Sequence, residues 1–340
     1  MNEMTQKKVA AILEVFGIYA AGQLVAFILA KVLGIPLYNP ITDITLQSTP
    51  LELRQITLKL LGVLFVQYAG WFLPIFLVGW WYRRRKPKQY GLTLSSKPIK
   101  WYLIAGVILF ALSELPTRAL TLLNTIHPLG AQTAWRETIF NMSWNSLEFW
   151  LLMGVGSFGL IPILEELFYR GYVQTRLEED LGAPTAILAT AVLFTLSHSQ
   201  YYILNAYNLG MLATILFSAI LWGYLFYRTR SLLVTIIPHI LVNIPVRGVI
   251  EWVLPVLMLF VCILAWKEIR KHLSDLIQFL RDTPYKWQTL TVILVVALFA
   301  IGYALFGDIV ILLGIVFFVS ALILEALDKR QARAHAVTEL

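Results

Sequence analysis

Long apolar runs, separated by short polar segments, make up most of this 340-residue chain. A helix that crosses a bilayer needs about 20 mainly apolar residues, and ten runs approach that length. They are residues 9–33, 58–82, 101–123, 147–170, 183–200, 208–227, 231–249, 250–266, 288–306 and 309–326. Because several are short or adjoin one another, the pattern predicts eight to ten spans. We therefore expect an all-α, polytopic transmembrane helical bundle.

The composition agrees with this pattern. Hydrophobic residues make up 59% of the chain and charged residues 14%, and the mean hydropathy is +0.73. These values indicate a multi-pass integral membrane protein and argue against soluble domains. The net charge of +7 would by itself also suit nucleic acid. The position of the basic residues favours the lipid bilayer as partner, so no nucleic acid is expected.

Most basic residues fall in segments that share one side of the membrane if the N-terminus is cytoplasmic. The densest cluster, Arg83–Lys88, follows the second apolar run directly, whereas outer segments such as 34–57 hold few basic residues. The positive-inside rule then predicts that both termini are cytoplasmic. No organelle transit peptide is recognised, which favours a prokaryotic plasma membrane.

Charge reappears at the end of the fourth apolar run, in Leu164–Arg170. Glu166 and Arg170 are four residues apart with the acid first, which favours an ion pair on one helix face. Glu165 points about 100° away from Glu166 and has no evident partner. Alone, such a cluster also suits the solvated end of a helix. We expect Glu166 and Arg170 to support a site and Glu165 to act in it.

A turn at Leu181–Pro184 predicts that the fourth and fifth helices form an antiparallel hairpin. Glu165 lies 16 residues before Leu181 and His198 lies 17 residues after it. Because both helices rise about 1.5 Å per residue, the two side chains are expected at one depth. Phe194 shares a helix face with His198 and is expected to shield the pair. By itself, His198 also suits an interface residue.

A third polar pair lies in the seventh run. His239 and Asn243 are four residues apart and therefore share a helix face. Pro238 and Pro245 flank them and loosen the helix locally. Asn243 by itself also suits a hydrogen bond between packed helices. Polar pairs on three helices at matching depth favour a catalytic site over separate structural roles.

These residue types suit hydrolysis by an activated water. A carboxylate held in a water-poor cavity can act as a general base, and His198 can share in activating the water. His239 and Asn243 carry N–H groups that can donate to a developing oxyanion. Neither serine nor cysteine forms part of the pattern, and Cys262 lies in a different apolar run. An activated water is therefore the expected nucleophile.

Three motifs occur in order along this part of the chain: Glu165-Glu166-x-x-x-Arg170, Phe194-x-x-x-His198 and His239-x-x-x-Asn243. Here the sequence resembles the CAAX protease and bacteriocin-processing family of intramembrane glutamate-dependent endopeptidases, also called the abortive infection family. The resemblance covers about residues 147–248. It implies a membrane-associated protein or peptide as substrate, prenylated for some members.

The resemblance also implies roles for the motif residues. Glu165 with His198 would activate the water, and His239 with Asn243 would hold the oxyanion. The Glu166 and Arg170 pair would support the site, as the helix geometry also suggests.

The motifs suggest a division of the chain into three parts. Residues 1–146 hold N-terminal helices and loops, residues 147–250 form the catalytic helical core, and residues 251–340 hold the C-terminal helices and tail. Within the last part, Lys267–Asp282 combines charges with leucines at helical spacing, which predicts an amphipathic helix on the membrane surface.

Two alternatives stay open. We expect no cofactor, but Glu165, His198 and His239 are also suitable zinc ligands, although no His-Glu-x-x-His helix is present. The other alternative is a non-enzymatic immunity or transport protein that binds a peptide in a polar cavity. Glu114 in the third run favours it, whereas Arg118, four residues later, favours a structural pair at that place.

Overall fold

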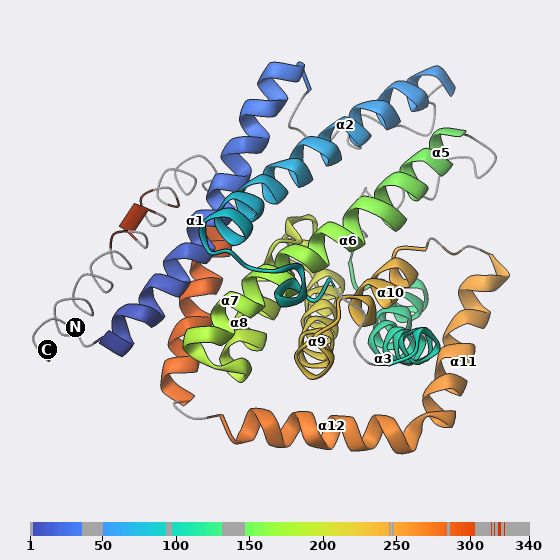
Figure 1. Ribbon diagram of the computed structural model, residues 1–340. Coiled ribbons are helices and arrows are strands. Elements are labelled where there is room, and N and C mark those ends of the chain that lie inside the picture. The colour runs from blue at the N-terminus through green and yellow to red at the C-terminus, as the bar shows by residue number, and fades with distance from the viewer. Residues whose placement is uncertain are drawn as a thin grey trace, which may run out of the picture.

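The computed structural model describes residues 3–35, 50–92, 97–130, 147–244, 246, 248–283, 286–302 and isolated positions between 314 and 323. Every regular element in these ranges is a helix, so the all-α prediction is confirmed (Figure 1). Most of the apolar run at 309–326 lies outside the described residues.

Five helices in the described part are long and apolar enough to cross a membrane, and six if one bent pair counts as a span. These helices make the chain an integral membrane protein, and within the described residues they account for five or six of the eight to ten predicted spans. Two apolar runs form shorter helices instead, Ala183–Leu196 and Leu233–Val242, and a third apolar helix, Lys286–Gly302, reaches the edge of the described residues. Most side chains of the first are buried, so its apolar run reflects burial inside the bundle. The cytoplasmic placement of the termini stays a prediction.

Helices α1 (Glu3–Leu33) and α2 (Pro50–Ile75) pack tightly along each other (Figure 1). A Cβ atom on Gly70 would lie 2.4 Å from the backbone oxygen of Gly22. Only glycine permits so close an approach of two helix backbones. The crossing therefore fixes α2 against α1.

A π-helical segment, η2 (Phe76–Tyr82), continues α2, and a short 3₁₀ helix, η3 (Pro87–Tyr90), follows it. The Tyr90 phenol packs over Gly79, where a Cβ atom would lie 1.7 Å from the hydroxyl oxygen. Burial raises the pKa of Tyr90 to about 12, so the phenol stays neutral at physiological pH. The link after α2 is thus anchored in the core.

One long helix carries the first predicted motif. Its parts are α5 (Leu147–Leu151), η4 (Leu152–Leu160), α6 (Ile161–Glu166), η5 (Leu167–Gln174) and α7 (Thr175–Leu181). The sequence predicts a helix from Leu147 to about Asp180, and this prediction is confirmed. The π-type winding of η4 and η5 was not predicted. Such wide turns are frequent at functional sites.

The chain reverses after α7, as predicted. Gly182 adopts a positive φ of 80°, and Pro184 stands in the first turn of α8 (Ala183–Leu196). Helices α3 (Ile99–Ile126), α9 (Ala206–Thr229) and α10 (Leu233–Val242) pack beside this hairpin (Figure 1). The hairpin and α10 thereby bring the three motifs into one region.

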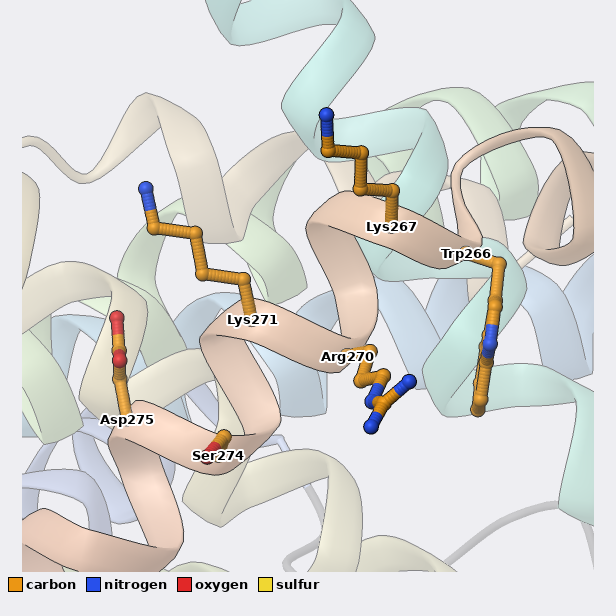
Figure 2. Close-up of a pocket in the computed structure, with 6 residues that line it drawn as sticks. All are labelled: Trp266, Lys267, Arg270, Lys271, Ser274 and Asp275. Carbon is orange, nitrogen blue, oxygen red and sulfur yellow. The ribbon is translucent and has the colours of Figure 1, made fainter.

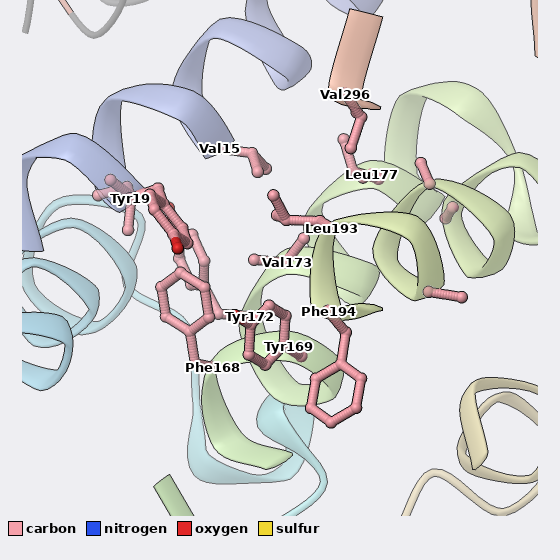
Figure 3. Close-up of a cluster of buried hydrophobic side chains, with 14 of the residues drawn as sticks. Val15, Tyr19, Phe168, Tyr169, Tyr172, Val173, Leu177, Leu193, Phe194 and Val296 are labelled. Carbon is pink, nitrogen blue, oxygen red and sulfur yellow. The ribbon is translucent and has the colours of Figure 1, made fainter. Parts of the chain in front are cut away.

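The largest hydrophobic core lies between the hairpin and the N-terminal helices (Figure 3). Tyr19 of α1, Phe168 and Tyr172 of η5, and Leu193 of α8 contribute to it. Val296, from the helix Lys286–Gly302, belongs to the same cluster. The proposed division at residues 146 and 250 stays a prediction, and the core includes residues from all three parts.

Helices α11 (Val249–Leu264) and α12 (Trp266–Arg281) meet at an angle of 78°. α12 lies along one edge of the bundle (Figure 1). Ile269 and Leu276 on its inner side are buried, while its charged side chains are mostly exposed. The predicted amphipathic helix is therefore present, and its place on a membrane surface stays a prediction.

A buried carboxylate, Glu14, joins α1 to the long helix and to the end of η2. It is 2% exposed and accepts hydrogen bonds from the Tyr172 hydroxyl at 2.7 Å, Arg176 Nε at 2.8 Å and Arg83 Nε at 2.8 Å. Glu14 was not predicted, because these partners lie 69 to 162 positions away along the chain and no local spacing points to them. Burial of a charge is costly unless opposite charges and hydrogen bonds compensate it, and here both are present.

We expect Glu14→Gln to destabilise the fold by about 3 kcal/mol, because Arg176 and Arg83 lose the opposite charge of the buried group. Thermal unfolding of the purified protein in detergent measures this as a lower Tm. Glu268→Gln makes the same chemical change at an exposed position of α12 and should leave Tm unchanged. Equal Tm values for the two variants would contradict a central role for Glu14.

Candidate active site

Glu166 of α6 is completely buried and joins two of the predicted motifs. Its Oε1 atom accepts a hydrogen bond from Arg170 Nη1 at 2.9 Å and lies 2.8 Å from His239 Nδ1. The pair with Arg170 has the four-residue spacing that the sequence indicates. The bond to His239 links the long helix to α10 and was not predicted.

Aromatic rings enclose the Arg170 guanidinium. Its central carbon lies 4.5 Å from the centroid of the Phe194 ring and 5.6 Å from that of Trp222. Cation–π attraction is strongest where water is excluded, and Arg170 is 1% exposed. The Glu166–Arg170 pair is therefore held in place by both charge and packing.

Phe194 lies at the centre of the site. Its ring centroid is 4.9 Å from that of His198 and 6.1 Å from that of His239. Both contacts are edge-to-face, a geometry that aromatic rings prefer. Phe194 thus separates and orients the two histidines, in addition to the shielding that the sequence suggests.

Glu165 has a partner that the sequence analysis did not find. The Tyr68 hydroxyl, from α2, donates a hydrogen bond of 2.7 Å to Glu165 Oε1. Glu165 Oε2 lies 3.7 Å from His239 Nε2. The Glu165 side chain is 15% exposed and that of Glu166 is fully buried. The two adjacent glutamates therefore occupy different environments, one enclosed and one partly exposed.

His198 follows the end of α8 and is partly exposed. Its Nδ1 atom lies 2.8 Å from the carbonyl oxygen of Phe194. Because a carbonyl oxygen only accepts hydrogen bonds, Nδ1 must carry the proton, and Nε2 of a neutral His198 is left as an acceptor. The Phe194 ring contacts both His198 and His239, and His239 Nε2 lies 3.7 Å from Glu165 Oε2. The hairpin and α10 thus place His198 in the same region as Glu165, and a direct pairing of the two stays a prediction.

Asn243 follows α10, one helical turn after His239. Its Nδ2 atom donates to the carbonyl oxygen of Ser157 in η4 at 3.2 Å. An amide nitrogen carries two hydrogens, so this contact uses one of them. The side chain is partly exposed and remains able to donate a second hydrogen bond.

Trp222 of α9 is a second residue that the sequence analysis missed. Its ring centroid lies 5.2 Å from that of His239, and its Nε1 donates a weak hydrogen bond to Ser113 Oγ of α3 at 3.4 Å. Neither Trp222 nor Tyr68 belongs to a motif. In the sequence, each is recognisable only as a side chain with one polar atom inside an apolar run.

Two further sequence expectations concern charges. Glu114 and Arg118 form a buried ion pair of 2.9 Å within α3, which agrees with the structural interpretation of Glu114. In the described part of the chain, no group of three or more His, Cys, Asp and Glu side chains is placed to hold a metal ion. His239 Nδ1 contacts Glu166, which leaves Nε2 as the ring nitrogen that could bind a ligand.

Residues 146–245 match one family model, that of the type II CAAX prenyl endopeptidase Rce1-like family. Comparisons with the curated proteins and with the solved structures give no match. The matched segment contains all three motifs and nearly coincides with the part that they cover. The resemblance to the CAAX protease family is therefore confirmed for residues 146–245.

Proposed function

We propose that this protein is an intramembrane endopeptidase that hydrolyses a peptide bond in a membrane-associated or lipid-modified protein or peptide. The observation that carries the proposal is the pair of adjacent glutamates in different environments. Glu166 is enclosed by Arg170 and His239, and Glu165 is partly exposed beside His239. The family match and the membrane-spanning helices support the reaction class.

In the proposed reaction, Glu165 and His198 activate a water molecule. The ionised Glu165 carboxylate and Nε2 of neutral His198 are both hydrogen-bond acceptors, so together they can orient both O–H bonds of one water. The water oxygen attacks the carbonyl carbon of the peptide bond while one proton passes to Glu165. Tyr68 holds the other carboxylate oxygen of Glu165 and thereby limits its rotation.

His239 and Asn243 would stabilise the oxyanion that forms on the carbonyl oxygen. The Glu166 carboxylate accepts from His239 Nδ1, so Nε2 donates only if the ring carries protons on both nitrogens. Glu165 and Glu166 supply two negative charges to balance such an imidazolium. Asn243 supplies its second amide hydrogen. When the tetrahedral intermediate collapses, Glu165 returns the proton to the leaving amine and the C–N bond breaks.

The Glu166–Arg170 pair has a supporting role in this proposal. It fixes His239 by the bond at Nδ1, and the rings of Phe194 and Trp222 pack against Arg170. The substrate is proposed to be membrane-associated because the site belongs to helices within the apolar bundle. A prenyl group on the substrate is suggested by the name of the matched family alone.

The central prediction is that Glu165→Gln abolishes cleavage, because the amide cannot accept a proton from water. Mass spectrometry of the membrane peptidome, compared between cells with the wild-type and the variant protein, should show peptide termini that depend on Glu165. Glu251→Gln on α11 is the matched control and should preserve these termini. A Glu165→Gln protein with full biological activity would favour a non-enzymatic peptide-binding protein.

A second prediction concerns Tyr68. Tyr68→Phe should reduce kcat roughly 10- to 100-fold, because a hydrogen bond to a charged group contributes about 1.5–3 kcal/mol. The loss should fall on kcat more than on KM, since Tyr68 orients Glu165 and not the substrate. Tyr102→Phe removes a hydroxyl from another buried tyrosine, on α3, and should preserve activity. Unchanged kcat in the Tyr68 variant would exclude the orienting role.

Chelation tests the proposed independence from metal. Because the described residues bring together no group of three or more metal-ligating side chains, we propose that water is activated without zinc. Activity should therefore persist after dialysis against a strong chelator, measured on the peptides that depend on Glu165. Loss of activity that added zinc restores would favour the zinc alternative.

A further inference from the structure

An open depression of about 470 Å³ lies on the outer side of α12. Two rows of side chains line it, each with the four-residue spacing of a helix face. One row is Trp266, Arg270 and Ser274, and the other is Lys267, Lys271 and Asp275 (Figure 2). The site described above does not include any of these residues.

The depression is strongly basic. Lys267, Arg270 and Lys271 are exposed, and Asp275 is the only carboxylate among the lining residues. Within the described ranges of the chain, none of these three basic side chains forms an ion pair. Their charges therefore remain available to an anionic ligand, and the Ser274 hydroxyl can add a hydrogen bond.

The neighbouring surface is apolar. α11 leads directly into α12, and its outward side chains include Phe260, Ile263 and Leu264, of which Leu264 is 71% exposed. Trp266, at the bend between the two helices, is 56% exposed. Tryptophan is enriched where the hydrocarbon core of a bilayer meets the headgroups. A lipid-facing apolar helix thus ends directly beside a group of cations.

We propose that this depression, lined by Lys267, Arg270 and Lys271 beside Trp266, binds the headgroup of an anionic phospholipid. The phosphate would lie among the three cations, and the acyl chains would follow the exposed apolar side of α11. Basic residues at the end of an apolar segment attract anionic lipids in this way. A soluble anion would match the cations but not the adjoining apolar surface, which is why a lipid is the expected occupant.

The test uses the full-length protein in detergent with equal amounts of phosphatidylglycerol and phosphatidylcholine, and measures lipid retention by native mass spectrometry. The wild-type protein should retain phosphatidylglycerol in preference. Combined Lys267→Gln, Arg270→Gln and Lys271→Gln substitutions should weaken its binding roughly 10- to 100-fold, because each basic residue near a membrane surface contributes on the order of 1 kcal/mol. Arg270→Gln alone should produce a smaller loss.

The matched control combines Lys86→Gln, Lys88→Gln and Lys100→Gln, which removes the same charge from three other exposed positions. It should leave the preference for phosphatidylglycerol intact. If both triple variants lost phosphatidylglycerol binding equally, the loss would follow from the lower net charge alone, and this result would overturn the proposal. Displacement of the lipid by millimolar glycerol phosphate would overturn it as well, because it would identify a site for soluble phosphates. Neither result depends on proteolytic activity.

Discussion

The geometry of the candidate site depends on one buried carboxylate. Glu166 Oε1 contacts both Arg170 and His239, so a single oxygen atom fixes the long helix relative to α10. An ion in so enclosed a place is stable only with compensating charge and hydrogen bonds. Phe194 and Trp222 keep the guanidinium in position. The orientation of His239, and through it the surroundings of Glu165, follows from this one arrangement.

A second buried carboxylate, Glu14, has a comparable role at another place in the bundle. It connects α1 with the long helix through Tyr172 and Arg176. The main hydrophobic core lies between these two helices and includes side chains from the N-terminal, central and C-terminal parts of the chain. The segment with the three motifs therefore shares its hydrophobic core with helices that precede it and follow it in the sequence.

Local spacing explains which features the sequence could predict. The four-residue spacing of Glu166 and Arg170 and the turn at Gly182 depend only on helix geometry, and both are found. The contact of Tyr68 with Glu165 joins residues 97 positions apart, which no local pattern encodes. Trp222 and Glu14 were missed for the same reason. The apolar run that forms α8 was predicted to be a span because hydropathy does not distinguish a helix buried in protein from one that crosses lipid.

The hydrogen bond from Tyr68 makes the position of Glu165 depend on α2, a helix outside the three motifs. The matched family segment begins at residue 146, but one oxygen of Glu165 is held by a side chain from α2. Small changes in the α1–α2 crossing at Gly22 and Gly70 would therefore change the position of the Glu165 carboxylate. Two chains with identical motifs can differ in reactivity through a helix that the motifs do not include. Selection for a new substrate or rate can thus act on α2 while every motif residue stays unchanged.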